Sequence, residues 1–224
     1  MQKTFQEQRL LFWRNKGFSP STILDIGAHR GTWGEGVHEI WPEAKIWMFE
    51  ANEQARENLE QVNYLEGFEI VLLGEREKIR VPYYMSTNDY NTGNSIYREQ
   101  TWYFEDCSVV DLPMTTLTKI VKKHQIKSID LVKIDTQGSE LDIVKGGREI
   151  IKHAEVVILE VPILEYNLGA PKMTEVILQM DKLDHSVLDI VEMHYLPSQE
   201  LFQIDLMFAK KSSDLFKKGN LYSI

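Results

Sequence analysis

The sequence predicts an α/β protein built on one doubly wound, mostly parallel sheet that ends in an antiparallel hairpin. Short apolar runs typical of buried strands alternate with amphipathic helical stripes along most of the chain. Repeated strand–helix units of this kind form parallel strands joined by right-handed crossovers. Near the C-terminus, the strand-like runs 187–193 and 202–209 are separated only by a loop around Pro197 and Ser198, which predicts the hairpin.

The first part of the chain contains a leading helix and a strand–helix unit. The run 22–26 is a strand because it is short, apolar and stopped by a glycine. A helix follows over 32–41, where apolar residues recur at spacings of four and three before a proline. The leading helix covers 4–15, and its apolar side chains are Phe5, Leu11, Phe12 and Trp13.

The later units continue this alternation. Two of their helices begin at a residue type that favours the N-cap position, Asn52 in one and Thr116 in the other. Each strand is a short apolar run, and each helix carries its apolar residues on one face. The expected units are a strand at 45–49, a helix begun by Asn52, a strand at 68–73, a helix begun by Thr116, a strand at 129–134, a helix at 139–152, a strand at 155–159 and a helix at 173–183.

One long insertion, residues 75–111, interrupts the alternation with an expected hairpin and a long connection. A connection of this length in a compact domain is usually a lid or a binding loop. Aromatic side chains could stack there against sugar rings or fill the core of the hairpin, and the sequence favours neither role. Seven of the 23 aromatic residues lie within positions 83–104, namely Tyr83, Tyr84, Tyr90, Tyr97, Trp102, Tyr103 and Phe104.

Length and composition predict a single domain over residues 1–224, with residues 1–20 as a helical extension. The net charge of −9 disfavours general binding to nucleic acid or to anionic membranes. The lone cysteine, Cys107, excludes an intrachain disulfide and fits a reducing compartment. The first ten residues lack the apolar core of a signal peptide, and no later run approaches the roughly 20 apolar residues of a membrane span. We therefore expect a cytoplasmic protein.

The first strand is followed by a glycine-containing turn, DIGAHRG at residues 25–31, at the edge where doubly wound sheets bind ligands. Gly27 and Gly31 allow a tight approach of backbone to ligand, and the next helix presents free N–H groups there. The spacing is not the G-x-G-x-x-G of dinucleotide enzymes. Asp25 is better placed to accept bonds from an ammonium group than to welcome a pyrophosphate.

The second strand ends in an acidic residue, Glu50, followed by Ala51 and Asn52. A carboxylate at this strand end can accept hydrogen bonds from both ribose hydroxyls of a nucleoside. An acid for an amine, a glycine turn and an acid for ribose together describe S-adenosylmethionine better than NAD. The sequence therefore favours S-adenosylmethionine as the cofactor.

The fourth strand contains a charged pair, Lys133 and Asp135, in an otherwise apolar run. A buried ammonium is costly unless it is paired, and Asp135 lies two positions on, on the same strand face. Gly138 allows a turn before the next helix, and Glu140 can satisfy N–H groups of its first turn. We expect Lys133 to pair with Asp135 and to keep it ionised.

Three segments resemble the FkbM-type methyltransferases, a class I group that depends on S-adenosylmethionine. They are DIGAHRG, the strand end FEAN and, most specifically, IDLVKIDTQGSELDIVKGG at residues 129–147. The resemblance runs from about residue 22 to 210 and includes LPMTTLTKIV, Asn94-Ser95-Ile96 and QIDLMFAK. It implies a Rossmann-like, seven-stranded sheet with an antiparallel last strand, and methylation of hydroxyl groups on sugars, polyketides or related natural products. His29 stands where the family usually has Asn, and Gln137 where many members have Glu.

The expected site combines these residues with polar side chains of later strands and of the insertion. Asp135 is the candidate for orienting or deprotonating the acceptor hydroxyl, with Lys133 as its partner, and Glu160 for holding a second hydroxyl. His194 is an alternative general base. Asp135 and Glu160 could instead ligate a divalent cation, although no metal is predicted. The acceptor is expected to contact Asn94, Ser95 and Glu160, and the cofactor to contact Asp25, Gly27, Ala28, His29, Gly31, Glu50, Ala51, Asn52, Asp135 and Gln137.

The function expected from these observations is O-methyl transfer from S-adenosylmethionine to a saccharide or other natural product. A catalytically inactive S-adenosylmethionine-binding module that acts as a partner or regulator is the alternative from another class. A nicotinamide-dependent oxidoreductase is disfavoured by the missing dinucleotide motif and by Asp25. The predicted partner is a small-molecule or saccharide acceptor, with no nucleic acid and no membrane span, and the sequence leaves the oligomeric state open.

Overall fold

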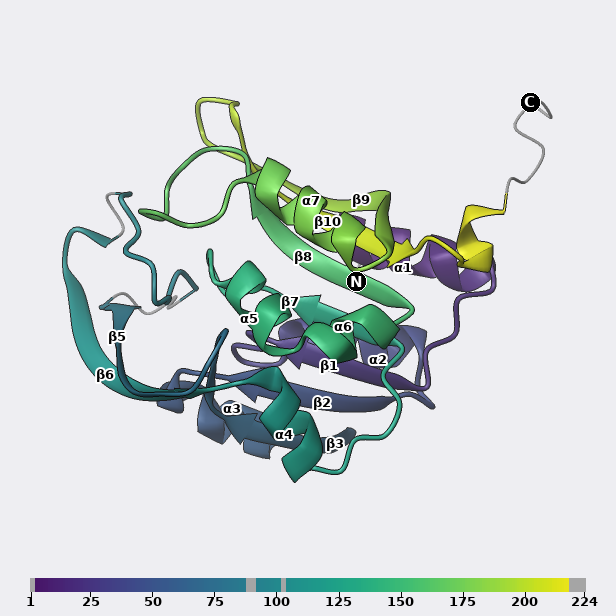
Figure 1. The fold of residues 1–224 in the computed structure, drawn as a ribbon, viewed down its shortest axis with the longest axis horizontal. Helices are drawn as coiled ribbons and strands as arrows, with labels where there is room; N and C mark the ends of the chain where they lie inside the picture. The colour runs from purple at the N-terminus through teal and green to yellow at the C-terminus, as the bar shows by residue number, and fades with distance from the viewer. Residues whose placement is uncertain (1–2, 88–91, 102–103, 218–224) are drawn as a thin grey trace.

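The computed structural model describes residues 3–87, 92–101 and 104–217 and places a seven-stranded sheet at the centre (Figure 1). Five neighbouring strands pair in parallel, whereas β10 runs antiparallel to both of its neighbours. The doubly wound sheet and the C-terminal hairpin expected from the sequence are therefore confirmed. The order across the sheet is β3 (Leu65–Ile70), β2 (Lys45–Glu50), β1 (Thr22–Ile26), β7 (Leu131–Ile134), β8 (Val156–Pro162), β10 (Leu201–Lys210) and β9 (His185–Tyr195).

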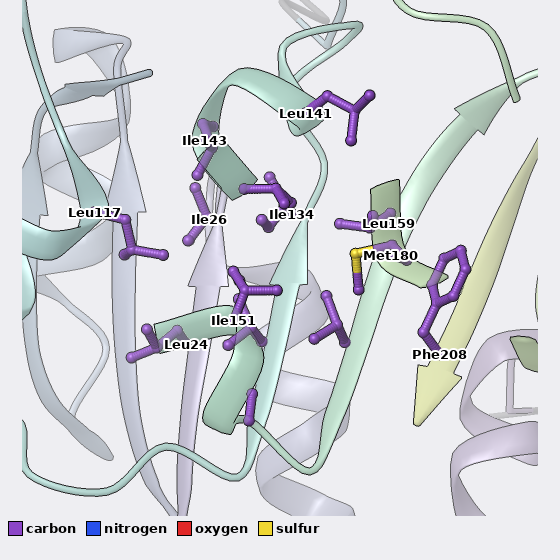
Figure 2. Close-up of a cluster of buried hydrophobic side chains, with 14 of the residues drawn as sticks. Leu24, Ile26, Leu117, Ile134, Leu141, Ile143, Ile151, Leu159, Met180 and Phe208 are labelled. Atoms are coloured by element: carbon purple, nitrogen blue, oxygen red, sulfur yellow. The ribbon is translucent and has the colours of Figure 1, made fainter. Parts of the chain in front are cut away.

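Helices cover both faces of this sheet, which explains why its central strands are continuous apolar runs. Successive residues of a strand point to opposite faces, so Ile23 and Leu131 join one core and Leu24 and Val132 the other. The second core, which contains Leu24, is drawn in Figure 2. One face carries α1 (Phe5–Asn15), α2 (Thr32–Ile40), η1 (Glu53–Ala55), α3 (Arg56–Glu60) and η3 (Asp214–Phe216), and the other α4 (Leu117–Lys123), α5 (Glu140–Gly146), α6 (Arg148–His153) and α7 (Met173–Lys182).

The insertion and the residues on either side of it form a second sheet of three strands, ordered β4 (Leu72–Leu73), β6 (Cys107–Thr115) and β5 (Lys78–Ser86). The single strand expected at 68–73 is wrong, because this run divides between the two sheets at Val71. Its periodicity is continuous, and only the hydrogen-bonding partners separate β3 from β4. Tyr83 lies in the small core of the second sheet. Tyr90, Trp102 and Tyr103 lie outside the described residues.

Two helices also differ from expectation. The helix predicted at 139–152 is divided at Gly147, where an added Cβ would lie 2.6 Å from the Leu117 side chain. In α1, Phe5 and Phe12 are exposed. The helix packs into the core through Leu10, which was not among the expected apolar contacts, and through Trp13, which was. No helix in the described part of the chain is both long and apolar enough to cross a bilayer.

Candidate functional site

A cavity of about 980 Å³ lies where the carboxyl ends of β1, β2, β7 and β8 meet the insertion. This is the edge at which open α/β sheets bind ligands. Eleven of the fifteen site residues predicted from the sequence line the cavity. The four that do not are Asp25, Gly31, Asn52 and Ser95.

The floor of the cavity is a close contact between the turn after β1 and the end of β7. Gly27 has a φ of 79°, and an added Cβ would lie 1.8 Å from the Asp135 carbonyl oxygen. The Asp135 N–H donates to the Ile26 carbonyl at 2.9 Å, and the Gly27 N–H donates to the Phe49 carbonyl at 2.8 Å. Any side chain at position 27 would separate these strand ends, so the turn requires glycine.

Glu50 connects the turns after β1 and β2. Its carboxylate accepts the His29 N–H and the Asn52 N–H, each at 2.8 Å. Burial raises the pKa of Glu50, and these backbone hydrogen bonds oppose that rise. Asn52 itself caps η1 by accepting the Gln54 N–H, which explains why its side chain is not part of the cavity wall.

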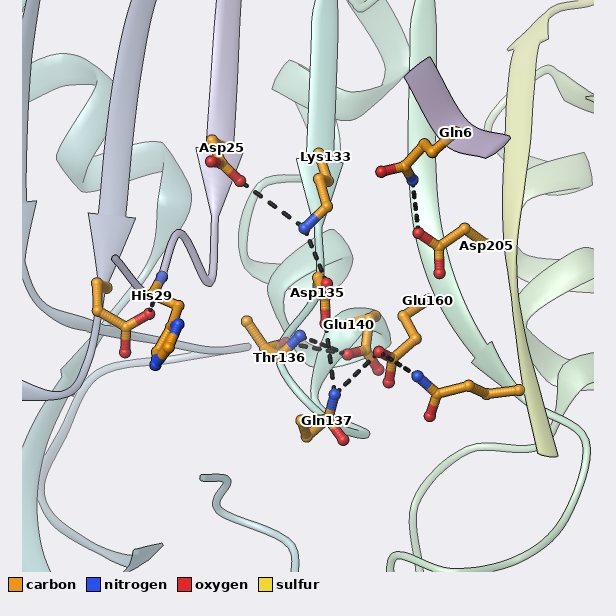
Figure 3. Close-up of polar contacts among 12 residues, drawn as sticks. Gln6, Asp25, His29, Lys133, Asp135, Thr136, Gln137, Glu140, Glu160 and Asp205 are labelled. Carbon is orange, nitrogen blue, oxygen red and sulfur yellow. Dashed lines mark hydrogen bonds and ion pairs between the residues drawn. The ribbon is translucent and has the colours of Figure 1, made fainter. Parts of the chain in front are cut away.

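Lys133 occupies the centre of a buried charged cluster on the α1 and α2 side of the sheet (Figure 3). Its Nζ lies 2.8 Å from Asp135 Oδ2 and 3.9 Å from Asp25 Oδ1, and 5.4 Å from the centre of the Trp33 ring. The expected pairing with Asp135 is therefore confirmed. Burial acts to lower the pKa of Lys133, but the surrounding carboxylates, Asp135 first among them, raise it overall.

Asp135 is favoured as a carboxylate at neutral pH. Burial acts to raise its pKa, but the charge of Lys133 and hydrogen bonding with Glu160 outweigh burial and lower the pKa overall. Its side chain lines the cavity. Asp135 is therefore an ionised carboxylate at the cavity wall, where it can accept a proton from a bound ligand.

Asp25 is fully buried, and neither carboxylate oxygen has a hydrogen-bond partner among the described residues. The contact with Lys133 at 3.9 Å is too long for a hydrogen bond. Burial raises the pKa of Asp25 to about 6, although Lys133 opposes the rise. A buried carboxylate without a close partner is costly, so a further positive charge nearby would stabilise the ionised form of Asp25.

Glu160 is held by three side chains that the sequence analysis missed or placed elsewhere. The side-chain amides of Gln137 and Gln203 each donate to Oε2 at 2.9 Å, and the Tyr166 hydroxyl lies 3.0 Å from Oε1. The Tyr166 hydroxyl also lies 2.7 Å from Gln203 Oε1, so Glu160 and Gln203 share it as a donor. Burial and the charge of Asp135 raise the pKa of Glu160 well above its usual range, which agrees with a neutral acid.

A second pair that the sequence did not reveal, Gln6 and Asp205, lies beside this charged cluster (Figure 3). Gln6 of α1 donates to Asp205 Oδ2 at 2.7 Å, and both side chains are buried. Burial and the nearby charge of Asp135 raise the pKa of Asp205 to about 6. The signal that could have found Gln203 and Asp205 is their two-residue spacing in an apolar strand, which places both on one face.

The insertion forms the opposite wall of the cavity and is fastened to the loop after β8. The Gln100 N–H donates to the Tyr166 carbonyl at 2.7 Å, and the Leu168 N–H donates to the Arg98 carbonyl at 2.9 Å. Asn94 lines the cavity and accepts the Ser86 N–H through Oδ1 at 2.8 Å. Ser95 is buried instead, and its backbone pairs with Tyr84.

His194, the alternative general base, lies at the cavity wall. His29 also lines the cavity, and its φ of 49° places it in the left-handed region within the β1 turn. Burial lowers the pKa of His29, so neutral imidazole is favoured. Within residues 3–87, 92–101 and 104–217, no group of three or more His, Cys, Asp or Glu side chains is arranged to hold a metal ion.

Sequence comparison identifies a family and one curated relative. The family model described as the methyltransferase FkbM domain matches residues 25–204. The chain is 26% identical over 152 residues to the 2-O-methyltransferase NoeI of Sinorhizobium fredii, a match covering 62% of this chain and 62% of that protein. The matched stretch thus spans less than two thirds of the relative's length.

Structural comparison finds the same sheet in methyltransferases of low sequence identity. The methyltransferase FkbM of Methylobacillus flagellatus superposes with a TM-score of 0.55 at 14% identity, over 92% of this chain and 48% of that one. The O-methyltransferase TomG of Streptomyces achromogenes, solved with S-adenosylmethionine, gives a TM-score of 0.50 at 12% identity, over 94% and 82%. At these identities the likeness establishes the fold.

Proposed function

Because this chain belongs to the FkbM family of S-adenosylmethionine-dependent methyltransferases, we propose that it methylates a hydroxyl oxygen of a saccharide or other natural product. The observation that carries the proposal is the Lys133–Asp135 pair, which places an ionised carboxylate at the cavity wall. The 2-O-methyltransferase relative supports oxygen as the methyl acceptor.

The described residues fit the cofactor at the β1 and β2 end of the cavity. Asp25 offers a buried carboxylate without a hydrogen-bond partner among the described residues beneath the glycine turn, suited to the ammonium group of the methionine part. It does not line the cavity, so we infer that it acts through its charge. Glu50 lines the cavity, and each oxygen retains acceptor capacity for a ribose hydroxyl. The backbone of Gly27, Ala28 and His29, with Ala51 and Gln137, would complete the cradle.

When bound, the cofactor supplies an electrophilic methyl group carried on a sulfonium. The protein must then hold the acceptor oxygen in line at about 3 Å and remove its proton at or after attack. Asp135 would accept this proton, and Lys133 keeps it ionised and fixes its position. Glu160, beside Asp135 at the cavity wall, would hold a second hydroxyl of the acceptor. Asn94 would contact the acceptor from the insertion side.

The direct test is methyl transfer from isotopically labelled S-adenosylmethionine to libraries of hydroxyl-bearing glycosides and polyols. We expect label in an acid-stable ether product, because transfer to oxygen leaves a methyl ether. Mass spectrometry locates the methyl group. Tight cofactor binding with no transfer to any library would instead support the inactive binding module.

Cofactor binding is expected to depend on pH through Asp25. In the free protein its pKa is about 6, and a nearby ammonium group favours the ionised form, which lowers this pKa in the complex. Affinity should therefore rise as pH increases from 5 to about 7 and then level off, with a proton released on binding below the plateau.

Calorimetry with S-adenosylhomocysteine in buffers of different ionisation enthalpy measures both quantities. Asp25→Asn should weaken binding at pH 7 and flatten the pH dependence. Asp111→Asn, at an exposed position of β6, is the matched control. An unchanged pH profile in the Asp25 variant would assign the titration to another group, with Glu50 and His29 the nearest in the site.

A further inference from the structure

Glu99, in the insertion, is a buried carboxyl group that the proposed reaction does not use. Its side chain lines the cavity, yet the residue is only 9% exposed. In the described part of the chain it forms no ion pair, and the Thr101 hydroxyl donates to its Oε1. Burial raises the pKa of Glu99, although the Thr101 hydrogen bond opposes the rise, so a cation bound nearby would favour its charged form.

The backbone holds Glu99 firmly in this position. Glu99 forms an antiparallel bridge with Asn167, and the hydrogen bonds of Arg98 and Gln100 to the loop after β8 lie on either side of it. That loop also carries Tyr166, whose hydroxyl contacts Glu160. These backbone contacts therefore hold Glu99 at the cavity wall.

The surroundings of Glu99 suit a positively charged nitrogen. A Cβ added to Gly93 would lie 2.5 Å from both Glu99 Oε2 and the Phe104 ring, so the carboxylate and the aromatic side chain pack against the same glycine and lie near each other. A carboxylate beside an aromatic ring is a favourable environment for an ammonium group. Asn94 is also nine-tenths buried, and its Nδ2 has no partner among the described residues, which leaves both N–H donors of this amide unused.

The charge of the whole cavity points in the same direction. Its described wall contains the carboxyl groups of Glu50, Glu99 and Asp135 and the neutral acid Glu160. Among the described lining residues the one lysine or arginine is Lys133, which is already paired with Asp135. Phosphorylated or carboxylated acceptors would meet this wall without a free cation to pair with. An acceptor bearing a positively charged amino group would meet carboxylates with which it can pair.

We propose that Glu99 binds a positively charged amino group of the acceptor, so that the acceptor class is a hydroxyl compound bearing an amine, such as an amino sugar. This proposal rests on the proposed function and narrows its acceptor. The hydroxyl that is methylated lies at Asp135, and the ammonium group binds at Glu99 on the opposite wall, near Phe104.

The test compares three acceptor libraries at equal subsaturating concentrations: aminoglycosides, the same compounds after N-acetylation, and neutral glycosides. We expect wild-type protein to methylate the amine library about 10- to 100-fold faster than its acetylated form, the usual effect of a hydrogen bond to a charged group. Glu99→Gln should remove this preference by slowing transfer to the amine library. Glu105→Gln, an exposed acid of the same insertion, should retain it.

Calorimetry with S-adenosylhomocysteine serves as the check on folding, because Glu99 is not among the residues assigned to the cofactor. Faster transfer by the wild-type protein to the amine library than to its acetylated form is itself evidence for the proposal and does not depend on any variant. Equal or faster transfer to the acetylated or neutral library, or an unchanged preference in Glu99→Gln, would overturn the inference and leave O-methyl transfer intact. Absence of transfer to all three libraries would count against the proposed function itself.

Discussion

Asp135→Asn is expected to slow methyl transfer by about 10²–10⁴-fold, the usual contribution of general-base catalysis. Asparagine preserves the shape of the side chain but cannot accept the hydroxyl proton as negative charge develops on oxygen. Lys133 lies 2.8 Å from Asp135 and lowers its pKa, so the wild-type carboxylate is ready for this role at neutral pH. Single-turnover rates with labelled S-adenosylmethionine measure the effect apart from product release.

Cofactor affinity should change little in this variant, because Asp25 and Glu50 remain. His194→Gln is the informative companion, since His194 is the alternative base at the cavity wall. A turnover within a few-fold of wild type for Asp135→Asn, together with a large loss for His194→Gln, would move the base to His194. Small losses in both variants would direct attention to Glu160.

Lys133→Met is expected to lower the free energy of unfolding by about 3–5 kcal/mol at pH 7, the usual cost of removing one member of a buried ion pair. The change leaves the carboxylates of Asp25, Asp135 and Asp205 without the cation they surround. For a chain of this size the melting temperature should fall by roughly 10 °C. Urea denaturation measures the loss directly.

The pH dependence of this loss has a definite sign. The folded-state pKa of Asp135 is depressed, so the stability it contributes with Lys133 is present above its unfolded pKa of about 4 and disappears as pH falls through the folded value. The difference between wild type and variant should therefore shrink in acid. Lys78→Met, at an exposed strand position, should change stability by less than about 0.5 kcal/mol. A similarly small effect at Lys133 would mean that the cluster is hydrated rather than buried.

Local patterns in the sequence were sufficient for the main sheet and for part of the site. The strand over Thr22–Ile26 and the helix begun by Thr116 appear in the structure as predicted, because apolar runs and caps act over a few residues. The Lys133–Asp135 pair followed from two-residue spacing on one strand. The glycine turn and Glu50 were found because parallel strands end at one edge of the sheet.

Long-range contacts decided the rest of the fold. The apolar run ending at Leu73 reads as one strand, and only its partners assign β3 to one sheet and β4 to the other. The stripe of α1 did not reveal that Gln6 is buried, because its partner Asp205 is 199 positions away.

The sequence by itself determined the doubly wound sheet, the glycine turn and the Lys133–Asp135 pair, since each depends on residues close together in the chain. Only the tertiary structure decided how these groups behave chemically. In it, Asp25 is buried without a hydrogen-bond partner in the described part of the chain, and Glu99 lies at the cavity wall. Glu160 is surrounded by Gln137, Tyr166 and Gln203. Burial and charge at a site depend on side chains from distant segments, and no local pattern encodes which of these meet.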